Sequence, residues 1–165
     1  MQFHRQLKLL NPSSENARPL RMYQQDRPAI NNFIKWHRLY IWVTNEDILE
    51  GRVISARVKW NNSSANWSKF SKPWDVVFGQ PNYGFFQLLI KHLPSELPKE
   101  KVQNPNIYSF EPRHRPVPLN YSHTEIVSVG NTGERPQKKE ISAATKKEFR
   151  QIISDRAVLL QYPKT

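Results

Sequence analysis

The side chains best suited to acid–base chemistry lie within one short stretch near the middle of the second half of the chain. His123 and Glu125 fall on a predicted strand, where side chains two positions apart project from the same face. An imidazole beside a carboxylate can stay charged or titrate near neutral pH, as a general acid or base requires. With His114 as a second imidazole and Arg113 or Arg115 to stabilise charge on phosphorus, the group predicts metal-independent cleavage of RNA.

The same side chains allow two other interpretations. In the first, His123 and Glu125 form a surface pair and His114 lies in a basic loop. In the second, the imidazoles and the carboxylate bind Zn, Mn or Fe. The third ligand would then come from a loop, and the chain has no HExxH motif, no acidic cluster and no cysteine. We therefore expect no metal and no other cofactor, and we expect Asp75 to cap backbone groups.

The balance of charge indicates the kind of partner. The chain carries 25 Lys plus Arg against 14 Asp plus Glu, which gives a formal net charge of +11. Residues 51–74 hold five bases and no acid, and residues 135–150 hold six bases and two acids. A surface that only keeps a protein soluble mixes the two signs more evenly. The excess predicts a polyanionic partner, nucleic acid above all.

Aromatic residues alternate with bases at 35–38, 59–60 and 67–74. Unpaired bases stack on exposed rings while Lys and Arg neutralise phosphates. We expect Trp67 and Phe70, in a polar loop without a clear period, to be the exposed rings. The pattern predicts an accessory module that binds RNA or single-stranded DNA in a larger nucleoprotein assembly. The predicted contact residues are Arg57, Lys59, Trp67, Lys69, Phe70, Lys72, Arg113, Arg115, Lys146, Lys147 and Arg150.

Two functions of other classes remain open. One is a toxin-like, metal-independent ribonuclease that uses His123, His114 and Glu125. The other is a basic interaction module that binds an acidic protein partner. The absence of GxxxxGK[ST], GxGxxG and GxSxG argues against nucleotide hydrolysis, a Rossmann site and a hydrolase elbow.

Composition also bears on the compartment. No apolar run approaches the roughly 18–20 residues that cross a bilayer, and the first residues lack the apolar stretch of a signal peptide. A chain without cysteine cannot be a disulfide-stapled secreted domain. We expect a cytoplasmic protein without a membrane partner, and the oligomeric state stays open.

Periodicity predicts a single α+β domain over 1–165 with a Pro-rich connection at 94–118. We expect a small, mostly antiparallel sheet of about five to six strands, a helix near 28–38 and a C-terminal helix near 142–156 capped by Ser142. The run 39–43 suits a buried strand or a continuation of the first helix, and 157–160 suits either a strand or an extension of the last helix. Thr44 is expected to cap one helical turn. The predicted strands cover 5–10, 53–60, 74–78, 83–90 and 124–129, the last extended to 122–129 if His123 and Glu125 share its face, and 107–110 is a short extended piece.

Overall fold

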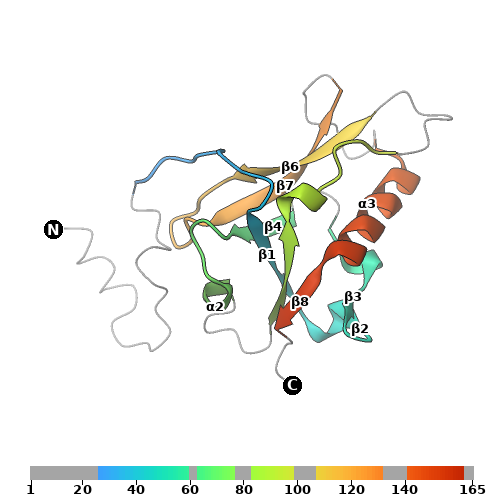
Figure 1. Cartoon of the computed structure of the whole chain (residues 1–165), viewed down its shortest axis with the longest axis horizontal. Helices are drawn as coiled ribbons and strands as arrows, with labels where there is room; N and C mark the ends of the chain where they lie inside the picture. Colours follow the sequence, from blue (N-terminus) through green and yellow to red (C-terminus); the bar gives the residue numbers. More distant parts are fainter. Residues whose placement is uncertain (1–25, 60–62, 77–82, 99–106, 132–140, 162–165) are drawn as a thin grey trace.

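A computed structural model describes residues 26–59, 63–76, 83–98, 107–131 and 141–161 (Figure 1). The main strands are β1 (Arg38–Val43), β4 (Ser63–Trp67), β5 (Gly84–Leu89), β6 (Tyr108–His114), β7 (His123–Gly130) and β8 (Val158–Gln161). A small hairpin consists of β2 (Ile48–Leu49) and β3 (Arg52–Val53). The helices are α2 (Pro73–Val76) and α3 (Ala143–Arg156), with short 3-10 turns η2 (Asn45–Asp47), η3 (Ser55–Arg57) and η4 (Ile90–His92).

The six main strands form one sheet in the order β6-β7-β4-β1-β5-β8, and every neighbouring pair is antiparallel. The predicted class is confirmed: the fold is α+β, with a six-stranded antiparallel sheet and a C-terminal helix. β6 lies at one edge, and this position tolerates Pro112 because an edge strand needs no second hydrogen-bonding partner. No helix in the described ranges is long and apolar enough to span a membrane.

α3 packs against one side of this sheet, which we call the inner face (Figure 1). Phe149 and Ile153 of α3 are almost completely buried against inner-face side chains such as Leu39, Phe110 and Ile126. The Ser142 hydroxyl accepts a hydrogen bond from the Thr145 amide, so the predicted cap of this helix is confirmed. On the opposite, outer face the register places the side chains that alternate with these, including Tyr40, Asn66, Phe85, His123 and Glu125.

The predicted helix near 28–38 is wrong. Its backbone groups bond elsewhere in the fold: the Ile30 amide donates to His114 Nδ1, and the Pro28 carbonyl accepts from the Tyr121 hydroxyl. Phe33 packs on Trp67 with ring centroids 4.0 Å apart. These contacts hold the segment in an irregular conformation until β1 begins, so 39–43 is a strand and does not continue a helix.

Two predicted strands are also wrong. The run 53–60 leaves the hairpin after Val53 and forms η3, because Val53 and Val58 are the side chains that reach the core. The run 74–78 begins inside α2, where Asp75 accepts a hydrogen bond from the Lys72 amide, as its expected capping role requires. The strand at 5–10 lies outside the described residues. Residues 158–161 form a strand, and Thr44 caps η2 with Asp47 in a capping box.

Candidate functional site

A cleft opens where the sheet divides between β1 and β4. The two strands pair only at Leu39 with Trp67 and at Tyr40 with Asn66. Beyond these positions β1 stays paired with β5 and β4 stays paired with β7, so the strands separate. The separation leaves a cavity of about 520 Å³ that reaches from the outer face to the α3 side of the core. Cavities of roughly 300–1,000 Å³ are typical of small-molecule sites.

The floor of the cleft is apolar and its outer rim is aromatic and polar. Side chains of the core, among them Val43, Phe86 and Phe149, form the floor. At the rim, Trp42 is 39% exposed and packs on Tyr83 with ring centroids 5.5 Å apart. One end of the cleft thus offers an accessible indole surface above an apolar interior.

A buried amide network forms one wall of the cleft. Asn66 is 7% exposed, and its Oδ1 accepts a hydrogen bond of 2.6 Å from Asn120 Nδ2. The Ser122 hydroxyl lies 2.7 Å from Asn120 Oδ1 and 3.0 Å from Asn66 Oδ1. These contacts fix the orientation of Asn66 relative to Asn120, since flipping either amide alone would set two like groups against each other. The Asn66 Nδ2 has no hydrogen-bond acceptor among the described residues.

His123 also lines the cleft, and its tautomer follows from its partner. The His123 Nδ1 lies 2.6 Å from the Arg115 carbonyl, which can only accept, so Nδ1 carries the proton. In the neutral ring Nε2 is then a hydrogen-bond acceptor. Glu125, two positions along β7, is held by an ion pair of 3.2 Å with Arg115. Among the described residues no hydrogen bond or ion pair joins His123 to Glu125, and the Glu125 carboxylate is engaged by the Arg115 guanidinium rather than by the imidazole.

His114 occupies the opposite face of the sheet. It pairs with Thr124 in the β6–β7 register, so its side chain belongs to the inner face and is 97% buried. Its Nδ1 accepts from the Ile30 amide at 3.0 Å and its Nε2 donates to the Tyr121 carbonyl. Burial lowers the pKa of His114 below its ordinary value. Both ring nitrogens are used, and the structure holds the ring in its neutral form.

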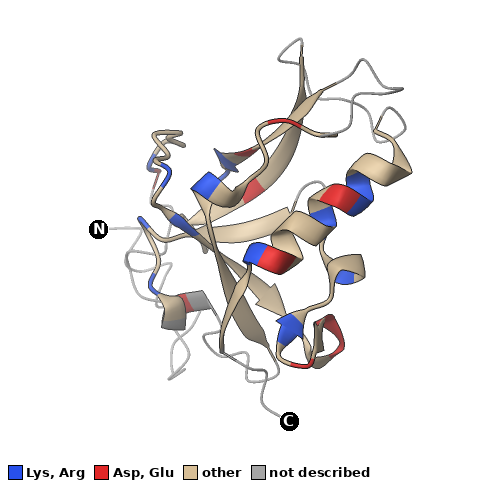
Figure 2. Ribbon diagram, turned by 45° about the vertical axis from the view of Figure 1, so that its right-hand side comes forward, with Lys and Arg blue, Asp and Glu red and all other residues tan. Residues whose placement is uncertain are grey.

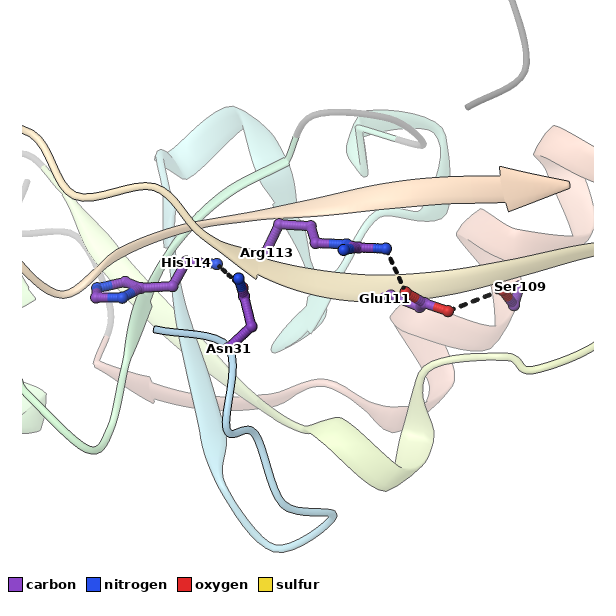
Figure 3. A network of polar contacts seen from close by, with 5 residues as sticks. All are labelled: Asn31, Ser109, Glu111, Arg113 and His114. Carbon is purple, nitrogen blue, oxygen red and sulfur yellow. Dashed lines mark hydrogen bonds and ion pairs between the residues drawn. The ribbon is translucent and has the colours of Figure 1, made fainter. Parts of the chain in front are cut away.

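The structure therefore does not bring the three predicted catalytic groups together. His114 faces the core, whereas His123 and Glu125 face the other side of the sheet. In Figure 3 the His114 ring points away from Arg113, which runs along β6 to an ion pair of 2.9 Å with Glu111. Within the described residues no three His, Cys, Asp or Glu side chains form a group able to hold a metal ion.

The predicted cationic residues divide into separate groups. Arg57 and Lys59 line the cleft on or beside η3, and α3 packs next to them, where Arg150 Nε donates to the Val58 carbonyl at 3.1 Å. Basic and acidic positions alternate along α3 in Figure 2. Arg57 lies 3.8 Å from Glu46 in an exposed pair. The remaining predicted cations of this group are Lys146 and Lys147, on the first turns of α3.

The loop after β4 differs from the prediction. Trp67 is fully buried, in contact with Phe33, His37 and His114, so its expected exposure is wrong. It is buried because the segment before β1 folds over it. Phe70 is half-buried and stacks on the His114 ring at 5.5 Å. The predicted cations of this loop, Lys69 and Lys72, are both exposed.

The exposed indole lies instead at Trp36, just before β1. Trp36 is 55% exposed, with Lys91 Nζ 4.2 Å and Lys35 Nζ 5.1 Å from its ring centroid. Backbone hydrogen bonds of 3.0 Å from Lys91 to Lys35 and from Ile90 to His37 hold this segment beside η4. The Ser68 amide donates to the Arg38 carbonyl, and the Arg38 amide donates to the Ser68 hydroxyl, both at 2.9 Å. Lys69, the next residue in the chain, therefore lies near Arg38. We call this region the Trp36 surface: Ile34, Lys35, Trp36, Arg38, Lys69 and Lys91.

The Trp36 surface was not among the predicted contact residues, apart from Lys69. Its signal in the sequence is the alternation of bases and rings at 35–38, which resembles that at 67–74. Comparison with family models, curated proteins and solved structures gives no match to this chain.

Proposed function

We propose that this protein binds single-stranded nucleic acid, RNA or single-stranded DNA, through the Trp36 surface. The observation that carries the proposal is an exposed indole with two lysine ammonium groups close to its ring. Lys91 Nζ and Lys35 Nζ lie 4.2 Å and 5.1 Å from the centroid of Trp36, so a base that displaces an ammonium group from the ring would stack on the indole with cations beside its backbone. Stacking on an aromatic side chain contributes about 1–3 kcal/mol per base and tolerates any base sequence.

The charge around this ring supports the same conclusion. The Trp36 surface gathers four cations, and no described carboxylate forms an ion pair with any of them. Cations without acidic partners are available to neutralise phosphates, and each one releases condensed counterions on binding. By contrast, Arg57, Arg113 and Arg115 of the predicted set are paired with glutamates. A place within a larger nucleoprotein assembly remains part of the proposal.

The ribonuclease alternative receives less support. Metal-independent cleavage needs an acid and a base at one substrate, and His114 is buried on the face opposite His123. The neutral His114 holds its ring proton in the hydrogen bond to the Tyr121 carbonyl and its other nitrogen accepts from the Ile30 amide, so neither nitrogen is available to a substrate. The structure thus favours binding over catalysis.

The proposal is tested by measuring the affinity for a labelled single strand of about eight nucleotides across a range of salt concentrations. Trp36→Ala is expected to weaken binding by about 5- to 150-fold, and Trp36→Phe to restore most of the affinity. Lys91→Gln should reduce the slope of log K against log salt by about 0.7. Leu49→Ala and Arg52→Gln, at exposed positions of the small hairpin, are the matched controls.

Two results would contradict the proposal. One is unchanged affinity of Trp36→Ala for the strand. The other is an equal loss of affinity of this variant for the strand and for polyglutamate, which carries charge but no bases. The second result would indicate an acidic protein partner, because only electrostatic contacts would then be lost.

A further inference from the structure

We infer that the cleft between β1 and β4 receives one unpaired nucleobase of the bound strand. This inference rests on the proposed function and assigns a second, separate site to it. The cleft has a volume of about 520 Å³, opens on the outer face and is lined by residues of β1, β4, β5 and α3 among others. Proteins that recognise a single base place it between apolar or aromatic side chains and bond its polar edge. The cleft offers both kinds of contact.

The polar contact comes from the side-chain amide of Asn66, whose Nδ2 has no acceptor among the described residues. Asn66 is more than nine-tenths buried, and Asn120 holds its Oδ1. Its Nδ2 therefore presents N–H donors to the cavity that no described residue accepts. A ligand acceptor at this position would form a hydrogen bond with Nδ2, with a net contribution of about 0.5–1.5 kcal/mol. The carbonyl oxygens and ring nitrogens of nucleobases are acceptors of this kind.

Acceptors also line the cleft. His123 Nε2 can accept a hydrogen bond, since Nδ1–H is donated to the Arg115 carbonyl. Along Ile41–Val43, the ladder partners of β1 among the described residues lie on the β5 side, and the other edge faces the separation from β4. Each nucleobase carries donors beside acceptors on its edge. A purely apolar ligand would leave these groups unpaired.

The remaining contacts suit the rest of a nucleotide. The partly exposed Trp42 ring at the rim can stack on a base, and its contact with Tyr83 fixes its position. Lys59 lines the same cavity and is exposed, so it can meet a phosphate at the mouth, beside Arg57 in its pair with Glu46. Asp47 is the acid in the lining, and its carboxylate already accepts two hydrogen bonds from Thr44.

The test uses two oligonucleotides and a variant with a large side chain at the mouth of the cleft. Ser64 lines the cleft but is exposed, so Ser64→Trp can fill the mouth without altering the core. Fluorescence anisotropy measures the affinity for a uridine strand of about eight nucleotides and for a strand of the same length that lacks bases. We expect Ser64→Trp to weaken binding of the base-bearing strand by about 10-fold or more and to leave binding of the base-free strand unchanged. Ala144→Trp, on an exposed position of α3 outside the cleft, should change neither.

If Ser64→Trp destabilises the fold, a second variant still tests the inference. Asn66→Asp keeps the acceptor for Asn120, removes the donor and adds a negative charge that acts on both strands. It should therefore weaken binding of the base-bearing strand by more than it weakens binding of the base-free strand, with folding checked by thermal unfolding. Equal affinities of the folded variants and the natural protein, or equal losses for both strands, would overturn the inference. If Trp36→Ala still weakens binding in that case, the proposed function stands and the cleft assignment falls. If no strand binds the natural protein, both fall.

Discussion

Replacement of His114 by asparagine should make the stability of the protein less dependent on pH. His114 is neutral in the fold, because the Ile30 amide donates to Nδ1 and burial lowers the pKa of the ring. The unfolded chain takes up a proton near the ordinary value of 6.5, whereas the folded chain does so only at lower pH. The stability that His114 contributes is therefore complete above pH 6.5 and is lost as the pH falls below it.

The size of the effect follows from these contacts. In His114→Asn, Oδ1 can still accept from the Ile30 amide, but the hydrogen bond to the Tyr121 carbonyl is lost. An unpaired buried carbonyl lowers the free energy of unfolding by about 1–3 kcal/mol at pH 8. At pH 5.5, one unit below the unfolded value, the natural protein alone has lost up to about 1.4 kcal/mol through protonation of its unfolded state. The gap between the two proteins should shrink by up to that amount.

Urea unfolding at pH 8 and at pH 5.5 measures this gap directly. His37 and His92, whose pKa values burial also lowers, are present in both proteins, and their contributions cancel in the comparison. A gap that stays constant between the two pH values would refute the reasoning, because it would mean that His114 binds its proton equally in the folded and unfolded chains. An RNA-cleaving role that needs a charged His114 would then deserve a new test.

Two further predictions concern stability. Ser142→Ala should lower the free energy of unfolding by about 1 kcal/mol, since the Thr145 amide loses its cap, while Ser142→Asp should retain the natural value; chemical denaturation distinguishes them. Phe149→Ala should cost about 3–5 kcal/mol, because this fully buried ring stacks on Phe110 at 4.0 Å, and a loss below 1 kcal/mol in a calorimetric scan would contradict the packing of α3 on the sheet.

The sequence predicts the elements whose local pattern agrees with their environment in the fold. The helix 143–156 has its cap and its buried stripe, and β5 and β7 are continuous strands near the predicted positions. The strand predicted at 53–60 failed although its alternation is regular. The 3-10 turn η3 lies between Val53 and Val58 and lets both side chains reach the core, although they are five positions apart. Periodicity alone does not show this, because it does not indicate which residues α3 will cover.

The candidate site could be predicted only in part. The alternation of bases and rings indicates a surface for nucleic acid, but the same pattern surrounds Trp36, which is exposed, and Trp67, which is buried. The difference arises because Phe33 folds onto Trp67 from a segment whose spacing predicted a helix. No local pattern in the sequence predicts the cleft. Asn66 and Asn120 meet because β4 pairs with β7, which lies far along the chain.

The division of the sheet also affects how the molecule can move. Two register pairs join β4 to β1, whereas six join β1 to β5 and seven join β6 to β7. The β6-β7-β4 and β1-β5-β8 halves are thus linked mainly by side chains and by α3, which touches Phe110 of one half and leads directly into β8 of the other. Separation of β1 from β4 breaks few backbone hydrogen bonds. Opening motions of the sheet should therefore concentrate between these strands and set the rate at which a ligand enters or leaves the cleft.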